Sequence, residues 1–305
     1  MAKKKIGMWM YKNGGGKEIQ KKMIAQLKER DIKVVKNLDL RFAEAEKEGI
    51  ICKKTNMNEL DLFFSYNAGE QTQGQLYLYE TLSKFIPTIN NFESFALAED
   101  KLRTNMALKA AGVNTSDYYM CHREQPEKLR DKLDEWGKMV FKPLDGWGGT
   151  GMALLDSQQS LDMLLPFLNQ TDIRNIYVER FIKNDFSDFR VDIVDGEFIA
   201  CYGRKASKRD WRTNVTSGGS VILREANDEI IDIAKRATKA TGLEIAGVDI
   251  LYDQEHEKYV VLEVNGIPAF ATPEQEAFGL DFNDRKIAKI VDLIDKTVHK
   301  KKKGN

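Results

Sequence analysis

The stretch that decides the fold is Lys142-Pro-Leu-Asp-Gly-Trp-Gly-Gly-Thr-Gly151. Four of its last six residues are glycine, and the backbone of such a loop can curl until several N–H groups point at one anion. Short apolar runs, 139–141 and 152–155, flank the loop and are typical of strands. The stretch therefore predicts a hairpin whose tip holds phosphate, with Lys142 placing a positive charge beside it.

The same glycines also fit other kinds of site. Gly146, Gly148 and Gly151 satisfy the pattern G-x-G-x-x-G. A dinucleotide-binding loop runs directly into a helix, whereas a strand is predicted after Gly151. The Gly-Lys-Ser/Thr of a Walker loop and the HRD and DFG motifs of protein kinases do not occur. A plain glycine hairpin without a ligand is the structural alternative.

A second group of residues predicts a metal site. Glu263 and Asn265 stand two apart at the end of a predicted strand, 259–264, so their side chains share one face. Asp249 lies in the preceding predicted strand, 246–252, and a hairpin would bring the three side chains together. Carboxylate and amide oxygens are the ligands that Mg²⁺ accepts alongside water and phosphate. An exposed polar pair at a strand end is the alternative interpretation.

The segment 203–214 is rich in cations. The planar fork of Arg212 can bind an oxyanion through two hydrogen bonds, which suits a transferring phosphoryl group. For Lys208 and Arg209 a solvated loop is an equal alternative. Upstream, the segment 179–182 closes an apolar strand and offers backbone groups to a nucleotide base.

Composition restricts the class of protein. The chain has 305 residues, which suggests two domains at about 150 residues per domain. Apolar residues make up 42% and charged residues 31%, which excludes a disordered or fibrous chain. No stretch approaches the roughly 18 apolar residues of a membrane span, and no signal peptide is recognisable. Basic and acidic residues number 47 each, which argues against a nucleic-acid-binding protein. The scattered cysteines Cys52, Cys121 and Cys201 favour reduced thiols and a cytoplasmic location.

The order of predicted elements divides the chain. Alternating strands and helices over 1–92 predict a small parallel α/β domain. One helix is expected from Ser94 to Ala111, ended by Gly112. Strands dominate afterwards, so 93–305 forms a second domain, with a glycine-loop lobe over 113–178 and a metal- and substrate-binding lobe over 179–305.

These segments, in this order, resemble the ATP-grasp superfamily, in particular ribosomal-protein-S6 glutamate ligases and prokaryotic glutathione synthetases. The resemblance covers Asn90 to the C-terminus, and 100–104 followed by 111–113 resembles the family's DK helix. It implies an α/β (α+β) fold in which a pre-ATP-grasp domain precedes two lobes that hold ATP between them. It also implies a homodimer or homotetramer that acts without nucleic acid or membrane.

The resemblance implies a role for each matching residue. ATP contacts fall on Lys101, Lys142, Asp145, Gly146, Gly148, Gly149, Thr150, Gly151, Glu179, Arg180, Phe181, Ile182 and Asp188. Asp249, Glu263 and Asn265 match the magnesium ligands, for two Mg²⁺ ions or for Mn²⁺ in their place. Arg212 and Asn214 match a catalytic R-x-N segment. Substrate contacts are implied for Arg190, Arg204, Lys205, Gly218 and Gly219.

The implied activity is ATP-dependent ligation of a carboxylate to an amine. The carboxylate takes the γ-phosphate to give an acyl phosphate, which the amine then attacks to form an amide. An amino acid or a short peptide is the expected substrate. A non-catalytic ATP- or ADP-binding protein of the same fold is the alternative. The chain departs from the family at 266–270, where Gly-Ile-Pro-Ala-Phe replaces a Ser-Pro turn, and this turn helps to shape the acceptor pocket.

Overall fold

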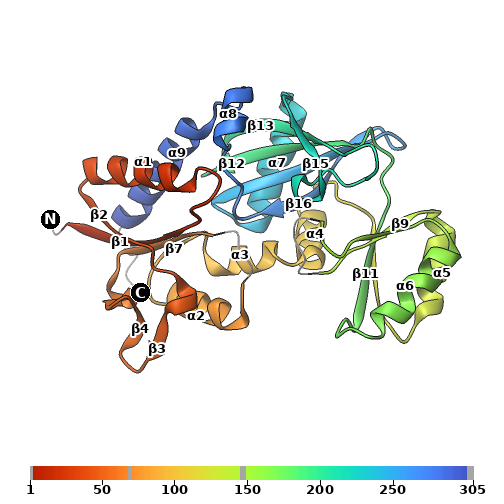
Figure 1. Cartoon of the computed structure of the whole chain (residues 1–305), viewed down its shortest axis with the longest axis horizontal. Coiled ribbons are helices and arrows are strands. Elements are labelled where there is room, and N and C mark those ends of the chain that lie inside the picture. Colours follow the sequence, from red (N-terminus) through yellow and green to blue (C-terminus); the bar gives the residue numbers. More distant parts are fainter. Residues whose placement is uncertain (1–2, 68–70, 145–148, 301–305) are drawn as a thin grey trace.

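The computed structural model describes residues 3–67, 71–144 and 149–300. Three sheets follow one another across the molecule (Figure 1): a parallel sheet near the N-terminus, a larger antiparallel sheet in the middle, and a small sheet with two helices at the opposite end. The α/β (α+β) class predicted from the sequence is therefore confirmed.

The parallel sheet has the order β2-β1-β6-β7. Its strands are β1 (Lys4–Met10), β2 (Ile32–Lys36), β6 (Leu62–Tyr66) and β7 (Thr88–Ile89). Successive side chains of a strand point to opposite faces, so Met8 packs in one core with α1 (Gly16–Glu29) while Trp9 packs in another with α2 (Gln73–Ser83). Between β2 and β6, two short 3₁₀ turns, η1 (Leu40–Phe42) and η2 (Met57–Glu59), enclose a small antiparallel sheet of β3 (Glu44–Glu46), β4 (Gly49–Cys52) and β5 (Thr55–Asn56).

The central sheet carries polar and apolar side chains on opposite faces. Its order is β14-β13-β12-β15-β16, all antiparallel, with β12 (Ser187–Val194), β13 (Glu197–Lys205), β14 (Ser220–Ile222), β15 (Ile245–Asp253) and β16 (Lys258–Asn265). The 3₁₀ turn η3 (Val215–Ser217) precedes β14. Phe189, Val191 and Ile193 of β12 pack in one core with α7 (Asp228–Thr241). The alternate residues Asp188 and Arg190 therefore lie on the other face.

The third sheet forms the small lobe, in the order β10-β9-β11-β8. Its elements are β8 (Tyr118–His122), α5 (Pro126–Trp136), β9 (Met139–Phe141), β10 (Ala153–Leu155), α6 (Gln158–Leu168) and β11 (Asn175–Arg180). Helices α5 and α6 cover one face, where Met139 and Phe141 are buried. Val140 and Lys142 alternate with them and face the centre of the molecule. Strands β9 and β10 pair antiparallel, which confirms that the glycine stretch joins two strands of a hairpin.

The single helix expected over 94–111 is wrong. The structure has two helices there, α3 (Phe92–Ala98) and α4 (Lys101–Ala110), with Glu99 and Asp100 between them. The Asp100 carboxylate accepts a hydrogen bond from the backbone N–H of Arg103 at 2.9 Å. Such an N-cap satisfies an unpaired donor of the first turn and begins a new helix. Gly112 follows α4 with φ +67°, as expected for a residue that ends a helix.

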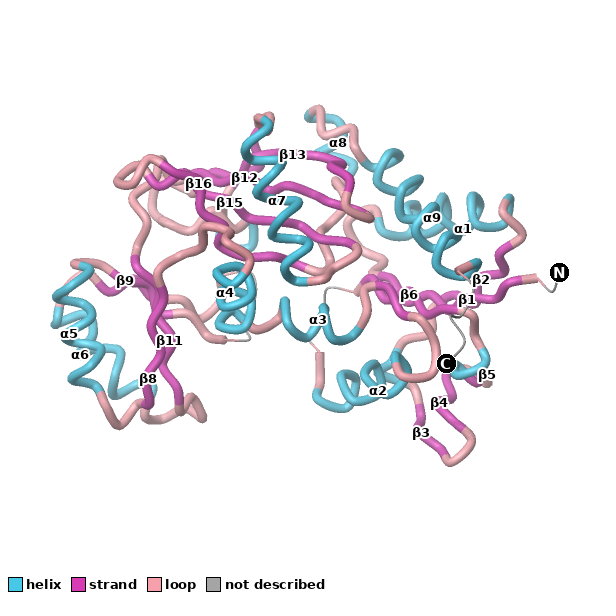
Figure 2. Tube along the Cα trace, turned by 180° about the vertical axis from the view of Figure 1, so that it is seen from behind, coloured by secondary structure: helices cyan, strands magenta, loops and turns pink. Residues whose placement is uncertain are grey.

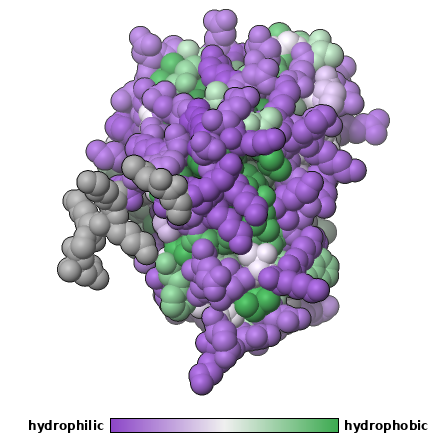
Figure 3. All heavy atoms as spheres, turned by 90° about the vertical axis from the view of Figure 1, so that its left-hand side faces the viewer, coloured by the Kyte–Doolittle hydropathy of each residue, from purple (hydrophilic) through white to green (hydrophobic). Residues whose placement is uncertain are grey.

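The C-terminal helix connects the parts of the molecule. After the short α8 (Pro273–Phe278), α9 (Asn283–His299) lies beside α1, and both pack on the parallel sheet (Figure 2). The domain boundary between residues 92 and 93 stays a prediction. Helix α9, which follows this boundary in the sequence, packs on the N-terminal sheet. The end of the molecule that carries α1 and β2 is mainly hydrophilic, with apolar residues in small areas (Figure 3). Within the described ranges, no helix is long and apolar enough to cross a membrane.

Candidate active site

Three adjoining cavities lie along the central sheet, and the first two also border the small lobe. The first is lined by apolar side chains, and we name it the apolar cavity; they include Val140, Phe181, Ile182, Leu251 and Leu262. The second, the charged cavity, contains Lys101, Lys142, Asp188, Asp249 and Glu263. The third, the wide cavity, is the largest of the three and is lined by Glu99, Arg190, Asn265, Phe270 and Thr272 among others. Asn214 borders all three, so they form one continuous site.

The glycine hairpin closes over the charged cavity. Gly149 and Thr150 line it, and the Gly149 carbonyl accepts a hydrogen bond from Arg212 Nη1 at 2.9 Å. Gly149 has φ +75°, and a Cβ there would lie 2.9 Å from Asn214 Oδ1, so only glycine fits this approach. Gly151 follows with φ +73° against Pro143. Asp145, Gly146 and Gly148 lie outside the described residues.

Lys142 is held by a buried carboxylate. Its Nζ lies 2.5 Å from Glu179 Oε2, and both side chains are almost fully enclosed. The Tyr177 hydroxyl donates to the other Glu179 oxygen at 2.9 Å, and Asn105 Nδ2 contacts that oxygen at 3.3 Å. Burial, followed by Glu179, raises the pKa of Tyr177 above its usual range, so this hydroxyl keeps its proton. The network fixes the ammonium group at the border of the apolar and charged cavities.

Asp249 belongs to a buried network of two carboxylates and two guanidinium groups. Arg190 pairs with it, and Arg204 Nη2 lies 2.8 Å from Asp249 Oδ2. Arg204 also donates to both oxygens of Asp188, at 3.0 and 2.6 Å, and Thr213 Oγ1 donates to Asp188 at 2.5 Å. Burial would raise the pKa of Asp249, but the two arginines lower it below the usual value. Asp249 therefore stays ionised at neutral pH.

The predicted metal ligands lie together through the register of β15 and β16. Asp249 stands opposite Glu263, and Asn265 stands opposite Gly247, two residues before Asp249. Asp249 and Glu263 face the charged and the wide cavities, and Asn265 faces the wide cavity. Glu263 makes no hydrogen bond or ion pair with any residue that the structure describes. One unpaired carboxylate, one shared carboxylate and an amide are a donor set that suits Mg²⁺.

Several other predicted residues lie where their side chains already have partners. Arg212 pairs with Asp210, with Nη2 and Oδ2 2.7 Å apart, and borders the apolar cavity. Lys205 is exposed on β13 and lines none of the three cavities. Gly218 and Gly219 form a close turn that lines none of them either. A Cβ on Gly219 would lie 2.3 Å from the Thr213 carbonyl oxygen, so this glycine supports the loop that carries Asn214.

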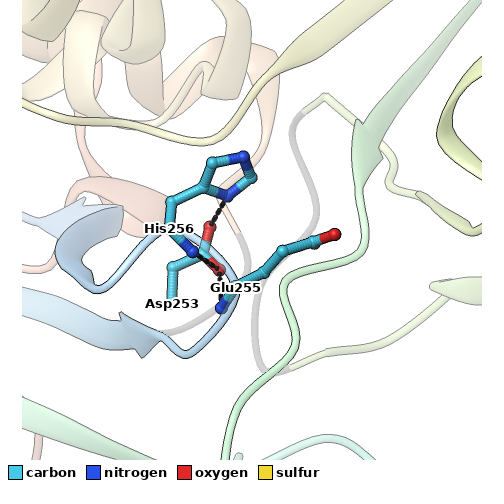
Figure 4. Close-up of side chains that lie close together, drawn as sticks. All are labelled: Asp253, Glu255 and His256. Atoms are coloured by element: carbon cyan, nitrogen blue, oxygen red, sulfur yellow. Dashed lines mark hydrogen bonds and ion pairs between the residues drawn. The ribbon is translucent and has the colours of Figure 1, made fainter.

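Arg180 belongs to a second carboxylate cluster, which Figure 4 shows in the loop between β15 and β16. The Asp253 carboxylate accepts hydrogen bonds from Arg180 Nη2 at 2.9 Å and, through its other oxygen, from the Glu255 N–H at 3.0 Å. His256 Nδ1 lies 3.0 Å from Asp253 (Figure 4), and the Glu255 carboxylate accepts a hydrogen bond from Arg180 Nη1 at 3.2 Å. Arg180 also pairs with Asp117 at 2.9 Å. Since Arg180 pairs with all three carboxylates, Asp117, Asp253 and Glu255, we interpret the cluster as a structural link between β11 and the central sheet.

Some residues of the site were not predicted from the sequence. Asn105 and Tyr177 act on Lys142 only through Glu179. Leu251 of β15 and Leu262 of β16 lie together in the wall of the apolar cavity, because that wall combines the two strands. Glu99 faces the wide cavity, but the single helix expected over 94–111 gave no reason to place it there. The available signal was Asp100, a favoured N-cap residue two positions before Leu102, the first apolar residue of the next helix.

Comparisons with known proteins agree with this geometry. Residues 98–291 match the family of RimK-like ATP-grasp domains. The chain belongs to this family. Its ATP-grasp fold and its class, an ATP-dependent carbon–nitrogen ligase, are thereby confirmed over the non-catalytic alternative. ATP-grasp ligases use ATP and Mg²⁺.

Relatives of this ATP-grasp chain are similar over most of its length. Tetrahydromethanopterin:alpha-L-glutamate ligase of Methanocaldococcus jannaschii is 28% identical over 246 residues, which are 79% of this chain and 82% of that protein. A probable alpha-L-glutamate ligase of Mannheimia succiniciproducens is 30% identical over 207 residues, 68% of each chain. The ATP-grasp ligase PsnB, solved with a minimal precursor, has a TM-score of 0.71 at 15% identity and covers 96% of this chain and 100% of its own.

Proposed function

We propose that this ATP-grasp chain joins a carboxylate to the amine of an amino acid through an acyl phosphate, with ATP in the apolar and charged cavities. The observation that carries the proposal is the continuity of the three cavities through Asn214, Asp249 and Glu263. The base, the phosphates and the acceptor then lie in one line, so the γ-phosphate meets the acceptor where the charged and wide cavities join.

Each part of the site supplies one requirement of the reaction. The apolar cavity encloses the base, and backbone groups after Arg180 can hydrogen-bond its edge. Lys142, with Lys101 across the charged cavity, attracts the phosphates as point charges. Phosphoryl transfer needs positioning and neutralisation of charge more than a protein nucleophile. The hairpin at Gly149 and Thr150 shields the acyl phosphate from water, which would otherwise hydrolyse it.

The metal site follows from the donor set. Asp249, Glu263 and Asn265 would hold two Mg²⁺ ions, or Mn²⁺, with the phosphate oxygens and water as further ligands. The metal supplies positive charge that neutralises the transferred phosphoryl group. A structure of PsnB in complex with Mg and ADP supports this proposal. We propose further that the chain acts in the cytoplasm and forms a homodimer or homotetramer. Light scattering tests the oligomeric state directly.

The amine substrate is an amino acid, and L-glutamate is the first one to test because the relatives are named as glutamate ligases. The wide cavity is the largest of the three, and we propose that it holds the amino acid next to the end of the carboxylate substrate. The carboxylate substrate requires a separate screen. The turn 266–270, which borders this cavity, differs from the family's Ser-Pro turn, so the relatives' substrates do not predict it.

A matrix of substrates tests the proposal. N-acetyl amino acids and N-acetyl peptides offer only a carboxylate, and amino acid amides offer only an amine. We expect ADP release to require one member of the first set, and hydroxylamine to trap the acyl phosphate as a hydroxamate. Nucleotide binding without ADP release or hydroxamate from any carboxylate would contradict the proposal and favour a binding protein.

A further inference from the structure

We propose that Glu99 binds the incoming amine of the acceptor, as the anionic residue that selects a positively charged amino group in the wide cavity. The inference rests on the proposed ligase function and adds a residue that recognises the second substrate. Glu99 lines the wide cavity together with Asn265, Thr272 and Gln275, and it does not line the charged cavity.

The break between two helices gives Glu99 this position. Glu99 is the C-cap residue that follows α3, and Asp100 is the N-cap of α4, where it accepts a hydrogen bond from the Arg103 N–H. Lys101, two residues later, lines the charged cavity. Two successive turns of the chain thus place a carboxylate at the acceptor side and a lysine at the phosphate side. A substrate amine at Glu99 would therefore be next to the acyl group formed at the border of the two cavities.

No cation that lines the wide cavity is a counter-ion of Glu99, and Lys101, whose charge acts on Glu99, lines the charged cavity instead. The cations that face the wide cavity are Arg190 and Arg204, and both pair with Asp249. The other titratable groups are Glu263 and Tyr202, neither of which is a cation. Among the described residues, the Glu99 carboxylate has no hydrogen-bond or ion-pair partner. A positively charged ligand is the group that would complete this environment.

The surroundings of Glu99 support the same ligand. Its side chain is exposed at the edge of the wide cavity, so a ligand can reach it. Burial first, and the nearby Glu263 second, raise the pKa of Glu99 to about 7, while Lys101 opposes them. A cation beside Glu99 relieves both effects. A substrate carboxylate is repelled there and is directed instead toward Lys101 and Lys142, so Glu99 distinguishes the two substrates.

Glu99→Gln tests the assignment, because it removes the charge and keeps the shape. We expect the KM for the amino acid to rise about tenfold or more in this variant, as for the loss of a charge-assisted hydrogen bond. Hydroxamate formation from the N-acetyl carboxylate should stay at the wild-type rate, since hydroxylamine is uncharged at neutral pH. Glu99→Asp should recover part of the affinity, and Glu93→Gln, an exposed change in the same helix, should match the wild type.

The outcomes separate the two proposals. If the wild type forms no hydroxamate, the ligase function fails before Glu99 is tested. If the wild type forms hydroxamate and Glu99→Gln keeps the wild-type KM for the amino acid, the assignment of Glu99 is wrong. It is also wrong if the variant needs more Mg²⁺ for hydroxamate formation, which would make Glu99 a further metal ligand. Thermal unfolding checks that each variant is folded.

Discussion

The charged cavity and the wide cavity adjoin each other but are built in different ways. In the charged cavity, Lys142 pairs with Glu179, and Arg204 pairs with both Asp188 and Asp249. These pairs are made before any substrate arrives, and they come from neighbouring strands of two sheets. In the wide cavity, Glu99 has no partner within the described ranges, and loop residues such as those of 267–272 line the cavity together with the strands of the central sheet.

This difference separates the common chemistry from the choice of substrate. Phosphoryl transfer uses the same charges for every acceptor, so a preorganised network costs no reorganisation during the reaction. The acceptor is recognised by loops, which can vary while the strands stay the same. The turn 266–272 is one such loop, and it is fixed from outside the cavity. Tyr66 donates to the Pro268 carbonyl at 2.5 Å, and Lys286 Nζ donates to the same oxygen at 2.8 Å.

The largest effect is expected for a change in the ion-pair network of the charged cavity. Asp249→Asn leaves two buried guanidinium groups with one counter-ion fewer, so the free energy of unfolding should fall by about 4 kcal/mol. Because the arginines lower the pKa of Asp249, the wild type should hold this advantage above the ordinary carboxyl pKa of about 3.9 and lose it as the pH falls further. Urea unfolding between pH 3 and pH 7 measures both. A difference that persists unchanged at pH 3 would contradict the role of this network.

Lys286→Met tests whether the turn 266–272 affects acceptor binding in the wide cavity without affecting nucleotide binding. Lys286 is fully buried and pairs with Asp192 at 2.7 Å, so its loss should cost about 3 kcal/mol of unfolding free energy. The KM for the acceptor should also rise, while the Kd for ATP stays the same. Adding Asp192→Asn should restore part of the stability. A parallel loss of ATP affinity, measured by calorimetry, would show that the two cavities are not independent.

Glu263→Gln should separate activity from stability. Glu263 has no partner among the described residues, so the unfolding free energy should change by less than about 0.5 kcal/mol. Turnover with Mg²⁺ should fall about 100-fold, as when a charge that acts on the transition state is lost. ADP release over a range of Mg²⁺ concentrations measures the effect. Wild-type turnover in this variant would remove Glu263 from the metal site.

The smallest effect on function is expected for Lys142→Ala, which removes one point charge from the nucleotide and also leaves the buried Glu179 without its counter-ion, so the variant should be less stable. The Kd for ATP should rise about tenfold, the loss of one charge-assisted contact. Lys138→Ala changes an exposed lysine just before β9 and should leave the Kd unchanged. Calorimetry compares the two variants. An unchanged Kd in Lys142→Ala would exclude Lys142 from the nucleotide site.

Local patterns in the sequence predicted most of the strands and the hairpins that carry the site. The glycine stretch before Met152 indicated a loop between two strands, and the spacing of Glu263 and Asn265 indicated one face of a strand. Both patterns report on the period of two of a β-strand, which depends only on neighbouring residues. The same reasoning failed over 94–111, because the apolar repeat continues across Asp100 while a cap hydrogen bond ends it.

The sequence by itself determined which residue types the site contains, but only the tertiary structure decided how they are paired. Arg190 and Arg212 look alike as cations in polar segments, yet one reaches Asp249 on the next strand and the other folds back on Asp210. Glu99 is one acidic residue among 47 in the chain, and its place in a cavity comes from a helix break and two sheets. Ion pairing and burial depend on which distant segments meet, and one-dimensional spacing carries no information about that.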